Sequence, residues 1–143
     1  MAYNFPLSNA IGTVLSSANT TGNALSAGTL NNVASLTLTP GSWDVSGVVN
    51  FISSGANTVT EIVMAISTAN NNTTAADNFG SGIGMLVATQ TDPSLSSTTG
   101  TTLFCGPGRL VVATNTTYFL NCAVAASILN CNAFGVIRAV RLI

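Results

Sequence analysis

Few residues in this chain of 143 could perform acid–base, nucleophilic or metal chemistry. There is no histidine and no lysine, and the chain contains three cysteines, three arginines and four acidic residues. Nucleophilic catalysis by serine or cysteine needs a base beside the nucleophile, and histidine is the usual one. A zinc site is disfavoured because the chain has no histidine and no Cys-x-x-Cys pair. We therefore predict that the protein is not an enzyme and holds no metal or cofactor.

The four carboxylates do not suggest a catalytic pair. Glycoside hydrolysis would need two of them to converge on one substrate. Asp77 and Asp92 lie in polar loops, where solvation or turn capping is the expected role. Asp44 and Glu61 fall on neighbouring predicted strands, where they could meet, but an arginine partner explains both more simply. We predict that Asp44 and Glu61 are salt-bridge partners of arginine.

The three cysteines are Cys105, Cys122 and Cys131. Cys122 and Cys131 could face each other across a hairpin. The simpler interpretation is that all three are small, buried, apolar residues in a reducing compartment.

Composition excludes two classes of partner. Charged residues make up 5% of the chain and the net charge is −1, so three arginines cannot neutralise a row of phosphates. No apolar run is long enough for a membrane span, and no basic segment precedes an apolar one as in a secretory signal. We therefore expect neither nucleic-acid nor membrane binding. A surface with so little charge repels its own copies weakly, which favours a protein covered by neighbours.

Strand-like alternation organises the chain from Val33 onward. Residues 1–32 are small, polar and weakly patterned, and they indicate an extended arm, with a short edge strand around Thr13–Leu15 as the alternative. The segment "WDVSGVVNF" then places Trp43 and every second residue after it on one face. Seven or eight short strands without helical periodicity predict an all-β protein over residues 33–143, an antiparallel β-sandwich or jelly roll.

The closing strand, "GVIRAVRLI", is apolar on both faces although it carries two arginines. Arg138 and Arg141 project to opposite faces, so one of them must point toward something apolar. One face would fill the sandwich, and sister subunits would cover the other. The alternative is that one arginine lies near a strand end and reaches solvent. The predicted interface comprises Phe134, Val136, Arg138, Val140, Arg141 and Leu142.

Two segments carry a family resemblance. The pair "LTLTPGSWDVSGVVNF" and "NAFGVIRAVRLI" resembles small tailed-phage virion proteins and tail-fibre head domains, in which an L-x-P-G-x-W-x-V-x-G segment opens the sandwich and a G-x-I-x-A-x-R-[IL] strand closes it. The resemblance covers residues 33–143. It implies a jelly roll of the tumour-necrosis-factor and complement-head kind that forms homotrimers about a threefold axis.

The resemblance implies one of two roles in a virion. Because no shaft precedes the sandwich, we expect a protein that decorates or cements the capsid exterior, bound to the major capsid protein or other virion proteins and assembled in the host cytoplasm. The alternative is the head of a short fibre or spike that binds host glycans through the loops at residues 69–78 and 93–99.

Overall fold

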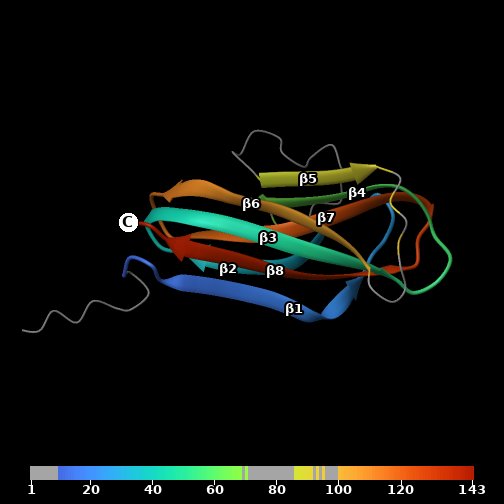
Figure 1. The fold of residues 1–143 in the computed structure, drawn as a ribbon, viewed down its shortest axis with the longest axis horizontal. Helices are drawn as coiled ribbons and strands as arrows, with labels where there is room; N and C mark the ends of the chain where they lie inside the picture. The colour runs from blue at the N-terminus through green and yellow to red at the C-terminus, as the bar shows by residue number, and fades with distance from the viewer. Residues whose placement is uncertain (1–9, 69, 71–85, 92, 94, 96–99) are drawn as a thin grey trace, which may run out of the picture.

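Eight β-strands form the protein in the computed structural model, which describes residues 10–68, 70, 86–91, 93, 95 and 100–143. One sheet has the strand order β1-β8-β3-β6 and the other β2-β7-β4-β5, with every pair antiparallel. This order is that of a jelly roll, and the predicted all-β sandwich is confirmed (Figure 1). The strands are β1 (Val14–Ala24), β2 (Asn31–Leu38), β3 (Gly41–Ser53), β4 (Thr58–Ser67), β5 (Leu86–Thr91), β6 (Thr101–Val112), β7 (Thr116–Ile128) and β8 (Cys131–Arg141).

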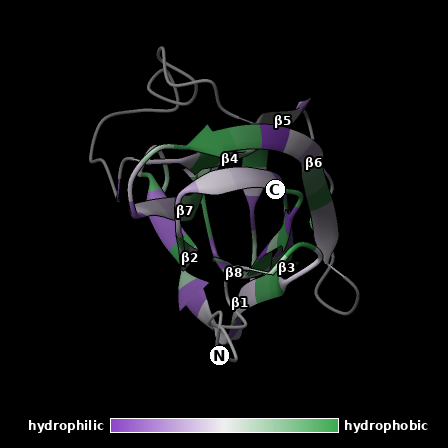
Figure 2. Ribbon diagram, turned by 90° about the vertical axis from the view of Figure 1, so that its left-hand side faces the viewer, coloured by the Kyte–Doolittle hydropathy of each residue, from purple (hydrophilic) through white to green (hydrophobic). Residues whose placement is uncertain are grey.

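The inner faces of the two sheets enclose the core, which Figure 2 shows end-on. In β3, every second residue from Trp43 to Phe51 is buried, because side chains alternate between the faces of a strand. Burying each large apolar side chain contributes roughly 1.5–3 kcal/mol. The largest side chains without exposed surface are Trp43, Phe51, Leu38, Ile62, Met64, Ile66, Leu120, Ile137, Val45, Val49, Val124 and Cys122.

Strand β1 lies within the segment that we predicted to be an arm. It pairs with β8 from Val14, opposite Val140, to Ala24, opposite Asn132. It is an edge strand with one neighbour in its sheet, and Leu15 packs against the core. A bulge interrupts it where Asn19 Oδ1 accepts hydrogen bonds from the backbone N–H of Thr21 and of Gly22. The sandwich thus includes residues 14–32, and residues 1–9 lie outside the described residues.

Strand β6 runs without a break through the sequence "GPG" at residues 106–108. It continues through Gly106–Gly108 because pairing with β3 holds on both sides, with Gly47 opposite Cys105 and Val45 opposite Gly108. The extra residues form a bulge. The apolar stretches before and after "GPG" therefore belong to one strand.

The start of β1 and the end of β8 meet at one end of the sandwich (Figure 1). The backbone N–H of Gly12 donates to the carbonyl of Arg141 (2.8 Å), and that of Ser42 donates to the carbonyl of Ile143 (3.1 Å). The last residues of the chain are thus tied between β1 and β3. This end also carries the arginines described below.

Candidate functional site

An apolar row crosses the outer face of the β1-β8-β3-β6 sheet. Val48 of β3 lies opposite Val136 of β8 and opposite Phe104 of β6, and Ala18 of β1 lies opposite Val136. Ala18, Val136, Val48 and Phe104, called here the apolar row, therefore adjoin one another across all the strands of the sheet. Phe104 is 56% exposed and Val136 is 41% exposed. An aromatic ring and a valine at these exposures are candidates for burial by a partner.

A shallow hollow of about 380 Å³ lies beside this row. Phe134 forms part of its wall and packs over Gly22, where a Cβ atom would lie 2.7 Å from the ring. Gly22 also has a positive φ of 79°, so the bulge and the ring position depend on glycine here. Most of the exposed lining is apolar. The lining residues are Asn19, Thr20, Val48, Asn50, Phe134, Gly135 and Val136.

The residues predicted for a subunit interface do not share one face. Phe134, Val136, Arg138 and Val140 lie on the outer face of β8, since the residues between them are buried in the sandwich. Arg141 lies on the inner side, at the last position of the strand, and Leu142 follows the strand end. Four of the six predicted residues therefore lie on the face that carries the apolar row.

Arg141 is held in place by the turn between β2 and β3. Its Nη1 donates to Thr39 Oγ1 (2.9 Å), its Nη2 donates to the carbonyl of Pro40 (2.7 Å), and its guanidinium lies 5.2 Å from the Trp43 ring centroid. Gly41 permits this approach, because a Cβ there would lie 2.7 Å from Nη2. An inward-facing arginine at a strand end thus finds carbonyl, hydroxyl and aromatic partners in its own chain.

Replacing Arg141 by glutamine is expected to lower the free energy of unfolding by roughly 1–3 kcal/mol, because the charge-assisted hydrogen bonds and the cation–π contact are lost. Arg138→Gln is the matched control. The side chain of Arg138 is exposed and forms no hydrogen bond or ion pair with the described part of the chain, so its loss should change stability by less than about 0.5 kcal/mol. Urea denaturation measures both values, and equal values for the two variants would contradict the role of Arg141.

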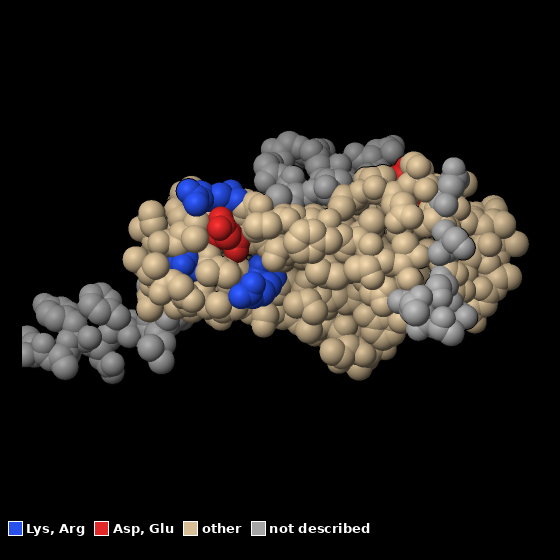
Figure 3. Space-filling model, viewed as in Figure 1, with Lys and Arg blue, Asp and Glu red and all other residues tan. Residues whose placement is uncertain are grey.

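The charged side chains of this face gather at one end (Figure 3). Arg109 on β6 lies opposite Asp44 on β3, with Nε 3.8 Å from Oδ1. Asp44 therefore meets an arginine, but from β6 instead of the closing strand. The pair is exposed, at 68% for the arginine side chain, so it adds little stability, about 0–1 kcal/mol.

Glu61 lies on β4, in the other sheet, where its neighbours across the strands are Thr91 and Ala125. The two acids expected on neighbouring strands are therefore in different sheets and cannot act as a catalytic pair. Although β3 and β4 follow each other in the chain, they belong to opposite sheets, which sequence spacing does not reveal. Asp77 and Asp92 lie outside the described residues.

The three thiols are free and buried. Loss of solvation by burial raises the pKa of Cys105 to about 11, against a smaller lowering by a backbone hydrogen bond from Gly47. Burial likewise raises the pKa of Cys131 to about 11, and it raises the pKa of Cys122, helped by the nearby Cys131. Thiols with raised pKa values are poor nucleophiles at neutral pH. A structural role follows for all three.

These thiols predict a loss of stability at high pH. The folded protein holds the protons of Cys105 and Cys131 to about pH 11, whereas an unperturbed thiol releases its proton near pH 9.0. The contribution of these thiols to stability is therefore complete below pH 9.0. The free energy of unfolding decreases as the pH rises from there toward 11. Denaturation at several pH values measures the slope. A Cys105→Ala, Cys131→Ala variant should show a shallower decline, and an unchanged one would contradict this origin.

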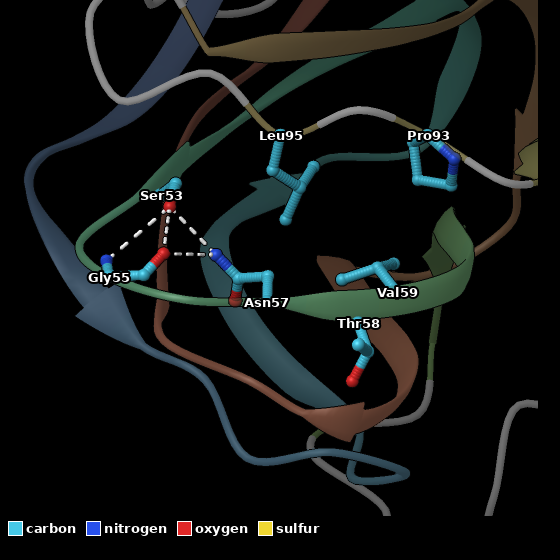
Figure 4. Close-up of a pocket in the computed structure, with 7 residues that line it drawn as sticks. All are labelled: Ser53, Gly55, Asn57, Thr58, Val59, Pro93 and Leu95. Atoms are coloured by element: carbon cyan, nitrogen blue, oxygen red, sulfur yellow. Dashed lines mark hydrogen bonds between the residues drawn. The ribbon is translucent and has the colours of Figure 1, made fainter.

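A second hollow, of about 410 Å³, lies at the other end of the sandwich (Figure 4). Pro93 and Leu95 line one side of it, facing the turn after β3. The polar groups of that turn are bonded to one another: Ser53 Oγ donates to the carbonyl of Gly55 (2.7 Å) and accepts from Asn57 Nδ2 (2.7 Å). Within the described residues, the side chains of Ser53 and Asn57 are therefore engaged with their own turn.

Among the described residues, no three metal-binding side chains come together. The same part of the chain contains no helix long and apolar enough to cross a bilayer.

Solved structures share this architecture. The infectious bursal disease virus VP2 subviral particle matches with a TM-score of 0.52 at 10% identity, over 91% of this chain and 32% of that chain. This chain and that structure share a jelly-roll fold. The infectious bursal disease virus Gx strain matches with a TM-score of 0.48 at 15% identity, over 92% of this chain and 33% of that one. The Cyanophage Pam1 capsid asymmetric unit matches with a TM-score of 0.44 at 17% identity, over 92% of this chain and 86% of that one.

This jelly roll spans about a third of the length of the bursal disease virus chains. No protein-family model matches it. No curated protein matches its sequence. The comparison with solved structures therefore identifies the fold of the chain.

Sequence reasoning did not assign three members of the apolar row, Ala18, Val48 and Phe104, to the jelly-roll surface. Val48 carried a signal, since it is the apolar residue among the polar ones on the outer side of "WDVSGVVNF". Ala18 and Phe104 carried no such signal, because their place in the apolar row depends on which strands are neighbours.

Proposed function

We propose that this chain is a non-enzymatic structural protein of a virus particle, which decorates or cements the capsid exterior as a homotrimer. The observation that supports the proposal is the apolar row on the outer face of a capsid-type jelly roll. A face of this kind on a chain with so few charges suits a permanent contact, in which burial of apolar area contributes about 25 cal/mol per Å².

The apolar row is proposed as the contact between copies. Its residues come from all four strands of one sheet, so the surface is rigid and loses little entropy on association. Phe104, at one edge of the row, is large enough to fill the hollow of a neighbour, which Val136 lines. Contacts between unlike patches of identical subunits close into rings, and a trimer is such a ring.

Particles of the virus that encodes this chain provide the test. Particles assembled with and without the protein are heated, and release of the genome is followed by a dye that fluoresces on nucleic acid. The proposal predicts release at a lower temperature when the protein is missing. Equal release temperatures for particles with and without the protein would show that the protein does not reinforce the shell.

The alternative role is a receptor-binding head that attaches to host glycans through the loops at residues 69–78 and 93–99. Most of these residues lie outside the described part of the chain, and the Ser53 and Asn57 side chains that line the hollow beside Pro93 and Leu95 bond within their own turn. Copy number separates the two roles. Quantitative mass spectrometry of purified particles should find the protein in amounts comparable to the shell protein, whereas a fibre head would be present in few copies.

A further inference from the structure

All the basic residues of this chain lie at one end of the sandwich (Figure 3). Arg109 and Asp44 share a row of the sheet with Val140 and Val14, and Arg138 lies two residues before Val140 on the same strand face. Arg141 is fixed on Trp43 at the strand end. Arg109, Arg138, Arg141 and Asp44 are called here the cationic end.

The cationic end carries a net positive charge. Its three arginines and one aspartate leave +2 there, whereas the chain as a whole carries −1. Asp44 compensates little of this charge. Its Oδ1 lies 3.8 Å from Arg109 Nε, and the side chain of Arg138 forms no ion pair or hydrogen bond with the described residues.

Exposed aliphatic side chains surround these charges. Val111 lies opposite Ser42, whose backbone N–H bonds to the carbonyl of Ile143, and Val14 lies in the row of Asp44 and Arg109. Exposure reaches 79% for Val111 and 73% for Ile143. The exposed aliphatic residues at this end are Ile11, Val14, Val111 and Ile143.

We propose that the cationic end is a docking surface for an acidic, partly apolar protein surface, one that offers carboxylates around an apolar patch. The arginines match the carboxylates, and the aliphatic side chains match the patch. Nucleic acid is a poorer match, because two unanchored arginines contact few phosphates and a phosphate backbone leaves the aliphatic side chains in water. Arg141 contributes a fixed positive charge rather than a mobile one, because its own turn holds it.

This inference extends the proposed function by naming the surface that faces the shell. Copies related by a closed cyclic axis present the same end on the same side, so a trimer built through the apolar row would direct its cationic ends toward one partner surface. Repetition of a weak contact in one assembly then strengthens attachment without any new interaction.

The test uses artificial surfaces in place of the unidentified partner. Gold sensors carry carboxylate-terminated, methyl-terminated or mixed monolayers, and surface plasmon resonance measures binding of the purified protein at low and high ionic strength. We expect the mixed surface to bind the protein more tightly than either pure surface does, with affinity decreasing at high salt. The double variant Arg109→Gln, Arg138→Gln should bind it about tenfold more weakly, roughly threefold for each exposed charge lost.

Two further variants separate the docking surface from net charge and from misfolding. Thr89→Glu with Gln90→Glu changes the net charge by the same −2 at exposed positions of β5, in the other sheet, and should leave binding nearly unchanged. Asp44→Asn removes the acid that competes for Arg109 and should tighten binding, a gain that a damaged fold would not produce.

Four results would overturn the proposal. The first is an equal loss of affinity in the glutamine and the glutamate double variants, and the second is binding to the methyl surface as tight as to the mixed surface. The third is arginine-dependent binding to a DNA duplex that is tighter than binding to the mixed surface. The fourth is arginine-dependent head-to-tail association of the protein with itself. Because this test needs neither virus particles nor a trimer, its outcome is independent of the test of the proposed function.

Discussion

Replacing Val136 by aspartate is expected to convert the assembled protein to monomers. Val136 lies near the centre of the apolar row and is 41% exposed in the single chain, so the variant should fold normally. In the proposed interface between copies, however, the new carboxylate would be buried without a partner. That costs roughly 3–5 kcal/mol, which lowers the association constant at least a hundredfold.

Native mass spectrometry and light scattering measure the change, with trimers expected for the unaltered protein. Ile128→Asp is the matched control. Ile128 is also an exposed aliphatic residue, 52% accessible, but it lies at the end of β7 in the other sheet. Its substitution should leave assembly intact. Monomers in the unaltered protein, or equal assembly of both variants, would remove the apolar row as the contact between copies.

Replacing Trp43 by alanine is expected to lower the free energy of unfolding by about 3–5 kcal/mol. Trp43 has no exposed surface, its Nε1 donates to the carbonyl of Thr39 (2.9 Å), and its ring lies beneath the guanidinium of Arg141. The substitution opens a large cavity and also removes the support of the turn between β2 and β3. Small domains are stable by only about 5–15 kcal/mol, so the variant should be close to unfolding at physiological temperature.

Circular dichroism in a denaturant series is the suitable measurement, because Trp43 is the single tryptophan and its fluorescence disappears with it. Trp43→Phe keeps most of the apolar volume and should lose clearly less stability than the alanine variant. Val111→Ala serves as the surface control, since Val111 is 79% exposed. Similar losses for Trp43→Ala and Val111→Ala would show that Trp43 does not anchor this end of the core.

The arginines of the cationic end have different roles. Arg141 fixes the turn that carries Thr39 and Pro40, and Arg138 and Arg109 remain open to solvent beside it. One arginine therefore has a structural role and two are available to a partner. Arg141→Gln should accordingly be detected mainly in unfolding, and Arg138→Gln mainly in binding.

Local pattern in the sequence determined much of this protein. Alternation of apolar and polar residues predicts that Trp43, Val45, Val49 and Phe51 share a buried face, and each of them has no exposed surface. The scarcity of charge and the absence of histidine are facts of composition that no fold can change. These inferences succeeded because the face of a strand on which a residue lies depends only on its immediate neighbours.

Only the tertiary structure decided which strands lie side by side. It placed Arg109 opposite Asp44, seated Arg141 on Trp43, put Glu61 in the other sheet and brought β1 into the sandwich. It also assembled Ala18, Val48, Phe104 and Val136 into one row from four strands. Such contacts join residues far apart in the chain, and they depend on strand order and register, whereas the alternation within a strand specifies a face but not a neighbour.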